Sequence, residues 1–286
     1  MSTTISASLV KELRDATGAG MMDCKRALEE TGGDLEAART LLRERGMASA
    51  GKRAGRETTE GAVGFIVDGG VGSIVGIGCE TEPVSKNDEF QEFAIKVLRG
   101  IHADGPDAVE SFEDERIDLI AKLGENIVIV SPTRFEAPSG NVLAGYAHPP
   151  ANKIGVLVEL EGGTEELARQ LAMHISFAAP EWTTRDDVPA EVLAAERSIF
   201  ENTEEVQSKP DAAREKIVDG MLNKRFFAAV PGGALVEQAW IHEPSKTVGQ
   251  ALADAGAAVA GFVRISVAGS CPRALRRSLK RARESA

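Results

Sequence analysis

The sequence has few of the residues that catalytic and metal sites use. Its 286 residues include only three cysteines and four histidines. Cys24, Cys79 and Cys271 are far apart and form no C-x-x-C pair, which argues against a structural zinc site and indicates a reduced, cytoplasmic protein. No H-E-x-x-H, G-x-S-x-G or G-x-G-x-x-G pattern occurs. The sequence therefore predicts a binding protein that is not an enzyme and has no metal site and no cofactor.

Long apolar runs are also lacking. No run approaches the roughly 18 residues that a membrane-spanning helix needs. The N-terminal stretch MSTTISASLV has neither the basic start nor the apolar centre of a signal peptide, and it is not rich in arginine. We therefore expect no membrane partner and a cytoplasmic location.

Negative charge dominates, but it is unevenly distributed. The net charge is −11, while residues 270–286 hold six basic residues and one acid. That tail carries +5, so the remainder carries −16. An acidic body repels nucleic acid over most of its surface, which leaves the basic tail as the one segment suited to RNA.

The stretch TGAGMMDCKRAL, residues 17–28, poses a specific question. Its glycines do not form a phosphate-binding loop, because Lys25 follows Gly20 by five residues and Arg26 replaces the required hydroxyl residue. Met21 and Met22 are adjacent, so a helix cannot bury both equally. We expect one to face the helical bundle and the other to face outward as an adaptable apolar contact. The alternative is that both fill a small core.

Local patterns predict an α+β protein that starts with helices. Residues 1–46 are predicted to form three short helices, with Ser6 and Asp34 as N-caps and an end at Gly46. Residues 47–60 have the composition of a linker. From Gly61 the pattern changes to strands, with Asp68-Gly69-Gly70 as a hairpin turn.

Two related α+β subdomains are predicted after the linker. Residues 61–139 and 140–269 each contain a strand, an acidic turn and an apolar-striped helix. Residues 188–227 interrupt the second subdomain with two helices and a short loop, which predicts an antiparallel hairpin. The runs ALVEQAWI and GFVRISVA are predicted as strands. Residues 270–286 form a basic tail.

Two histidines are candidates for contacts. His174 lies on an apolar helix face, so a hydrogen-bonded core position is favoured over a contact role. His148 lies in the proline-rich stretch GYAHPPANK, where partner binding and loop packing are both open.

Four stretches carry a specific resemblance. They are LVKELRDATGAGMMDCKRALEETGGDLEAARTLLRERG, CETEPVSKNDEFQEFAIKV, GENIVI and EPSKTVGQAL. Together they closely resemble the bacterial elongation factor Ts family, from about Ser6 to Val267. The resemblance implies guanine-nucleotide exchange on elongation factor Tu in its GDP-bound and nucleotide-free forms, without a cofactor. It also implies that the N-terminal helices resemble a ubiquitin-associated domain and dock on Tu.

The resemblance further implies which residues meet Tu and how the hairpin is used. The hairpin matches a protruding coiled coil that can mediate homodimer contacts. The positions that match the family's Tu contacts are Arg14, Met21, Met22, Thr81, Glu82, Pro83, Val84, Ile127 and His148.

Residues 81–84 depart from the family's usual pattern. The family has Thr-Asp-Phe-Val where this chain has Thr81-Glu82-Pro83-Val84. Glu82 keeps a carboxylate and Pro83 keeps an apolar surface, but the aromatic wedge beside the Tu magnesium site is lost. This loss leaves open an adaptor that binds Tu without exchange. The basic tail separately leaves open an RNA- or ribosome-associated factor that acts through residues 270–286.

Overall fold

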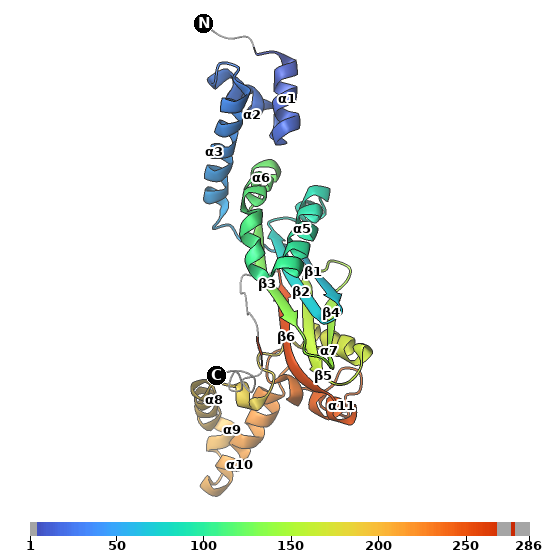
Figure 1. The fold of residues 1–286 in the computed structure, drawn as a ribbon. Coiled ribbons are helices and arrows are strands. Elements are labelled where there is room, and N and C mark those ends of the chain that lie inside the picture. Colours follow the sequence, from blue (N-terminus) through green and yellow to red (C-terminus); the bar gives the residue numbers. More distant parts are fainter. Residues whose placement is uncertain (1–4, 268–275, 278–286) are drawn as a thin grey trace.

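The chain folds as a mixture of helices and antiparallel sheets, an α+β arrangement (Figure 1). The structure is a computed structural model that describes residues 5–267 and 276–277. Its helices are α1 Ala7–Thr17, α2 Met21–Glu30, α3 Leu35–Arg53, α4 Glu82–Ser85, α5 Asp88–Asp104, α6 Glu113–Leu123, α7 Glu165–Ala178, α8 Ala190–Glu201, α9 Glu204–Gln207, α10 Asp211–Met221 and α11 Val248–Asp254. Short 3₁₀ helices are η1 Pro106–Phe112, η2 Arg185–Asp187 and η4 Leu235–Glu237, and η3 Leu222–Phe227 is a π-helix.

Two sheets form the centre. The first has the order β1 Glu60–Asp68, β2 Val71–Cys79 and β3 Val128–Glu136, and the second has the order β4 Asn141–Ala147, β5 Ile154–Glu161, β6 Ala258–Ser266 and β7 Arg276–Arg277. All pairs are antiparallel. One apolar cluster joins the two sheets: Val63, Ile74, Phe135, Leu143, Leu157, Val263, Ile265 and Val267. Burying these side chains away from water fixes one sheet against the other.

Helices cover the sheets. The apolar face of α5 packs on β1 and β2 through Phe90, Phe93 and Val97. On the second sheet, α7 packs on β4 and β5 through Leu171 and Ile175. These helices carry apolar residues three and four positions apart, the spacing that places them on one face.

The N-terminal helices form their own small core of Val10, Leu13, Cys24, Ala27, Leu28 and Ala38. Ser6 and Asp34 cap α1 and α3 as predicted. The predicted helix end at Gly46 is wrong, because α3 continues to Arg53. Gly46 lies against α6, where an added Cβ would be 3.5 Å from the Cβ of Ala121. Packing against α6 therefore outweighs the poor helix propensity of glycine.

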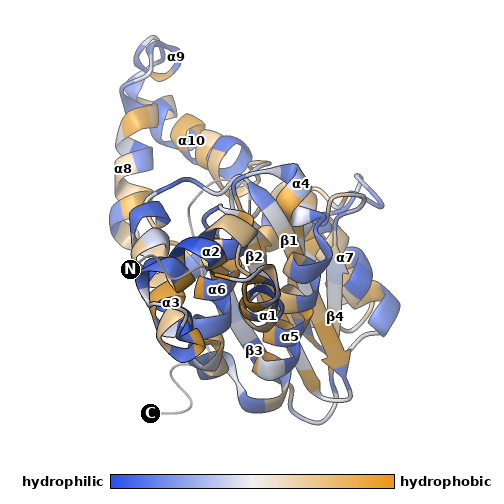
Figure 2. Ribbon diagram, turned by 90° about the horizontal axis from the view of Figure 1, so that it is seen from above, coloured by the Kyte–Doolittle hydropathy of each residue, from blue (hydrophilic) through white to orange (hydrophobic). Residues whose placement is uncertain are grey.

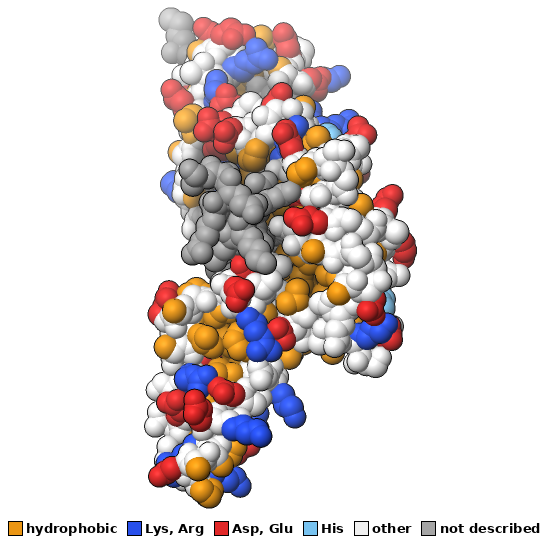
Figure 3. All heavy atoms as spheres, turned by 60° about the horizontal axis from the view of Figure 1, so that its bottom comes forward, with side chains coloured by type: hydrophobic (Ala, Val, Ile, Leu, Met, Phe, Trp, Pro, Cys, Tyr) orange, Lys and Arg blue, Asp and Glu red, His pale blue; other side chains and the backbone are white. Residues whose placement is uncertain are grey.

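The hairpin predicted at residues 188–227 contains α8, α9 and α10. Val206, Val218, Met221 and Leu222 lie in its core. Ile199, an apolar residue of α8, does not join this core, because its side chain is exposed. In Figure 3, acidic and basic side chains alternate over the end of the molecule that carries the hairpin. No described helix is long and apolar enough to span a bilayer.

In the second half, one predicted strand is wrong and one observed strand was not predicted. The run ALVEQAWI forms η4 and two isolated bridges, from Ala234 to Trp182 and from Ala239 to Thr247. It forms no continuous strand, because Leu235 and Trp240 are drawn into the core under α7. Strand β4 was missed. The predicted division into domains and a linker stays a prediction, and the tail lies outside the described residues except for Arg276 and Arg277.

Candidate functional site

Met21 and Met22 are both on the surface. They occupy the first two positions of α2 and are 56% and 61% exposed. The chain enters this helix through a tight turn, because Gly18 adopts a left-handed conformation at φ 68°. First-turn residues have no preceding helical turn to cover them. The expectation that one methionine faces the bundle is therefore wrong, and so is the alternative that both fill its core.

Arg14 lies near this turn. Its carbonyl accepts the hydrogen bond from the Gly18 N–H at 2.7 Å, and its side chain is exposed. An exposed cation near the end of α1 and two exposed methionines at the start of α2 flank the turn between these helices. We call Arg14, Met21 and Met22 the methionine patch.

Residues 81–84 form a second exposed feature, here called the 81–84 tip. They begin the one-turn helix α4, with Thr81 as N-cap and Glu82 and Pro83 in its first turn. Thr81, Glu82 and Pro83 are exposed and Val84 is half-buried. The predicted turn is thus a helical turn, which suits proline because the first helical N–H groups need no partner within the helix.

Glu82 has a local partner. Its Oε1 lies 2.7 Å from the Nζ of Lys86, and both side chains are largely exposed. The hydrogen bond from Lys86 lowers the pKa of the Glu82 carboxyl, and the same bond raises the pKa of Lys86. Because an exposed pair contributes little, Glu82 can exchange Lys86 for another partner at small cost.

Glu125 holds the tip from the other side, and sequence reasoning missed it. Its carboxylate accepts hydrogen bonds from the N–H of Glu80 (3.1 Å), the N–H of Thr81 (2.9 Å) and the Thr81 hydroxyl (2.5 Å). This explains why the Thr81 side chain does not cap α4. The only sequence signal was the position of Glu125 directly after Gly124, the left-handed end of α6.

His148 lies at the start of the connection between β4 and β5, here called the 148–153 turn. Its N–H donates to the carbonyl of Ile154 at 2.8 Å, and its carbonyl accepts from the N–H of Asn152 at 2.9 Å. The ring Nδ1 lies 3.0 Å from the hydroxyl of Tyr146. The exposed imidazole is therefore held in place by its own turn.

Ile127 is placed differently from the expectation. Its side chain is fully buried among the residues that α5 and α6 pack on β2, and its carbonyl accepts a 2.7 Å hydrogen bond from Arg116. A side chain without exposed surface offers nothing to a partner in this structure. The predicted contact through Ile127 therefore stays a prediction, with no exposed side-chain surface to support it.

The structure brings some of these residues together and separates others. The 81–84 tip and the 148–153 turn both lie next to the start of β1, where Glu60 pairs with Lys153. The methionine patch belongs to α1 and α2, and Figure 2 shows α2 well apart from α4. The candidate site therefore consists of two separate surfaces.

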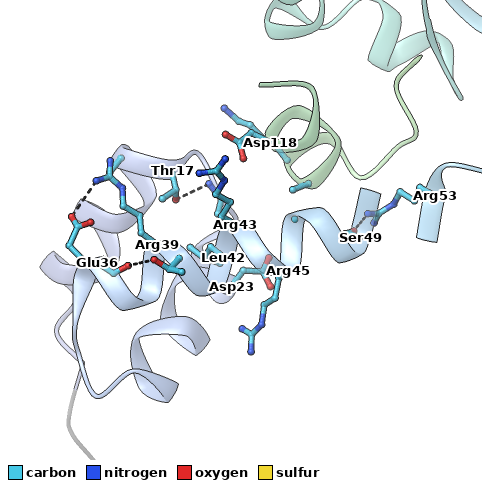
Figure 4. A pocket seen from close by; sticks show the side chains of 17 residues that line it. Thr17, Asp23, Glu36, Arg39, Leu42, Arg43, Arg45, Ser49, Arg53 and Asp118 are labelled. Carbon is cyan, nitrogen blue, oxygen red and sulfur yellow. Dashed lines mark hydrogen bonds and ion pairs between the residues drawn. The ribbon is translucent and has the colours of Figure 1, made fainter. Parts of the chain in front are cut away.

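A cleft lies between the N-terminal helices and α6. It encloses about 630 Å³, and eight of its 17 lining residues are charged, of which Asp23, Arg43, Arg45, Arg53 and Asp118 are among those labelled in Figure 4. Arg43 of α3 forms an ion pair with Asp114 of α6 at 2.6 Å, and burial raises the pKa of the Asp118 carboxyl. Among the described residues, no cluster of histidine, cysteine or carboxylate side chains could hold a metal ion.

Comparison with known proteins identifies relatives along nearly the whole chain. Residues 80–269 match the family model described as Elongation factor TS. Elongation factor Ts of Alkalilimnicola ehrlichii is 43% identical over 275 residues, which cover 92% of each chain. The protein of the same name from Idiomarina loihiensis is 42% identical over 273 residues, and that from Escherichia coli K12 is 43% identical over 267 residues, each covering 92% of this chain and 91% of the relative.

Proposed function

This chain belongs to the elongation factor Ts family, and we propose that it promotes GDP release from elongation factor Tu so that GTP can bind in its place. One observation carries the proposal beyond family membership. Apart from Ile127 and the half-buried Val84, the residues that match the family's Tu contacts are exposed, in the methionine patch, the 81–84 tip and at His148. The protein works by binding, in the cytoplasm, and requires no covalent step.

Thermodynamic linkage supplies the principle of exchange. A factor that binds nucleotide-free Tu more tightly than GDP-bound Tu must weaken GDP binding by the same ratio. Such a factor needs surfaces that fit the nucleotide-free form, and it needs no acid, base or metal of its own. The two separated surfaces suit this task, because one can dock while the other deforms the nucleotide pocket.

We assign docking to the methionine patch and pocket deformation to the 81–84 tip. Methionine side chains adapt to irregular apolar surfaces, and Arg14 adds a charge for orientation. The tip is fixed by the hydrogen bonds to Glu125 and by its own helical turn, α4, so pressing it against Tu costs little ordering entropy. Glu82 would be the polar contact near the magnesium ion of Tu, and Pro83 the apolar wedge.

The finer architecture belongs to the same proposal. We propose a three-helix docking module, two related α+β subdomains and an inserted hairpin that can mediate homodimer contacts. Charges of both signs on the hairpin are compatible with self-association.

Release of labelled GDP from Tu tests the proposal. Catalytic amounts of this protein are expected to accelerate release, and the acceleration should persist when residues 270–286 are deleted. An adaptor would bind Tu and leave the rate unchanged, an alternative that the loss of an aromatic wedge at Pro83 keeps open. A factor that acts through its tail would show salt-dependent RNA binding that the deletion abolishes.

A further inference from the structure

Lys153 closes the 148–153 turn with an ion pair to a distant strand. Its Nζ lies 2.5 Å from Oε1 of Glu60, 93 positions earlier in the chain. The two side chains are only 32% and 20% exposed. The second carboxylate oxygen of Glu60, Oε2, is buried and has no hydrogen-bond partner among the described residues. Removing Lys153 alone would thus leave a partly buried carboxylate without its ion-pair partner.

The backbone of the same turn is tied on two sides. The Asn152 carbonyl accepts from the N–H of Val63 in β1 at 2.7 Å, and the Lys153 carbonyl accepts from the N–H of Val267 at 3.0 Å. The ion pair therefore joins a turn that is already aligned with the start of β1. Its geometry depends on two sheets packing together and on no local sequence pattern.

Glu60 is equally close to the tip. It faces Cys79 in the ladder of β1 and β2, and α4 begins three residues after Cys79. The next residue, Gly61, lies so close to β2 that an added Cβ would be 2.0 Å from the carbonyl oxygen of Ile77. No other residue fits there without displacement, so the position of Glu60 relative to the tip is fixed.

We propose that Glu60 and Lys153 are positioning residues whose ion pair holds the 81–84 tip and the 148–153 turn as one rigid surface toward Tu. The inference rests on the proposed function. Neither residue needs to touch Tu, because each acts through the element that it holds. The pair keeps His148 at a set distance from Glu82 and Pro83, so that both elements can meet the nucleotide-binding side of Tu together. Misplacement by about 1 Å can reduce a rate a hundredfold.

The chain offers a matched control. Glu82 and Lys86 form an ion pair of similar length, 2.7 Å, but their side chains are 63% and 73% exposed and lie in the same helical segment. Lys86→Met removes the lysine that pairs with Glu82 at the tip and leaves the ion pair between Lys153 of the 148–153 turn and Glu60 in place. A general loss of positive charge near the tip would affect Lys86→Met and Lys153→Met alike.

The first measurement is GDP release from Tu by the full-length protein. Lys153→Met and Glu60→Gln are each expected to slow release about tenfold or more. The double variant should be no slower than the slower single variant, because both changes remove one interaction. Lys153→Arg should restore most of the rate, and Lys86→Met should stay within about twofold of the parent. Equal slowing by Lys86→Met, or unchanged release by the double variant, would overturn the proposal.

The second measurement separates this proposal from the proposed function. Spin labels at Asp88→Cys, beside the tip, and Ala151→Cys, in the turn, report the distance between the two elements in a Cys271→Ser background. The distance distribution should broaden in Lys153→Met and stay narrow in Lys86→Met. Unchanged distance distributions would refute the positioning role of the ion pair, even if GDP release slows. If the parent protein does not accelerate GDP release from Tu, the proposed function fails. The distances alone then still decide whether the ion pair holds the two elements together.

Lys153→Met could also fail to fold, because it strands the Glu60 carboxylate. The double variant Glu60→Gln with Lys153→Met removes both charges and avoids that penalty. Broadened distances and slowed release in this double variant would support the proposal, and parental values of both would refute it.

Discussion

The carboxylate of Glu125 binds both the N–H and the hydroxyl of Thr81, at 2.9 and 2.5 Å, across 44 positions of sequence. A third bond comes from the N–H of Glu80. One side chain thus satisfies three donors at the point where β2 ends and α4 begins. Charge-assisted bonds of this kind are stronger than neutral ones, so the tip owes its rigidity to a residue that does not belong to it.

Glu125→Ala is expected to loosen the tip. Leaving three donors to water should lower the free energy of unfolding by about 1–3 kcal/mol and slow GDP release from Tu. Urea unfolding and labelled-GDP release measure the two effects. Glu110→Ala, an exposed carboxylate on η1, serves as the control and should change neither. A Glu125→Ala protein with parental stability and rate would show that Glu125 does not hold the tip.

Met21→Ala combined with Met22→Ala should weaken the complex with Tu by about 2–4 kcal/mol, the scale of interface hot spots. The fold should survive, because both side chains are exposed. Calorimetric titration gives the affinity and thermal unfolding gives the stability. Met47→Ala, which removes another exposed methionine on α3, should bind like the parent. Loss of folding in the double variant would mean that the patch is structural.

Glu82→Ala combined with Pro83→Gly tests the tip directly. The variant should release GDP more slowly, while its affinity for nucleotide-free Tu changes less, because docking rests on the methionine patch. Stopped-flow release and equilibrium binding separate the two quantities. Parental release would shift the mechanism to the methionine patch and His148.

Cys79 should be inert to thiol reagents in the folded protein. Its Sγ is buried, and burial raises its pKa to about 12, so almost no thiolate forms near neutral pH. A Cys271→Ser variant leaves Cys24 and Cys79, both buried. Labelling with iodoacetamide should require unfolding, and mass spectrometry locates the label. Rapid native labelling at Cys79 would show that the β2 end opens readily.

Stability should fall in mild acid through His174. Burial lowers the pKa of this imidazole below its ordinary value of 6.5. Its Nδ1 accepts from the N–H of Ile241 (3.4 Å), so Nε2 carries the proton and donates to Gln238 (3.0 Å). As pH falls, the unfolded chain protonates His174 before the folded chain does. The free energy of unfolding is therefore unaffected by His174 above about pH 6.5 and decreases as pH falls toward the lowered pKa.

His174→Gln should flatten that pH dependence between pH 7.5 and 5.5, measured by urea unfolding. His148→Gln, which makes the same substitution at an exposed imidazole, provides the comparison. An unchanged slope in His174→Gln would assign the acid sensitivity to carboxylates.

Much of the local structure follows from the sequence. The stretch Asp68-Gly69-Gly70 does connect β1 to β2 as predicted. The caps of α1 and α3 and the amphipathic stripes of α5 and α7 also follow from short stretches. Each of these signals lies within one or two turns of chain, where backbone geometry and side-chain spacing decide the outcome.

Tertiary structure alone decided the rest. The sequence contains Glu60, Lys153, Thr81 and Glu125, but only the packing of two sheets and the end of α6 brings them into pairs. It also decided that α3 passes Gly46 and that Ile127 turns inward. These outcomes depend on contacts between segments far apart in the chain, whose free energies outweigh local propensity once apolar surface is buried.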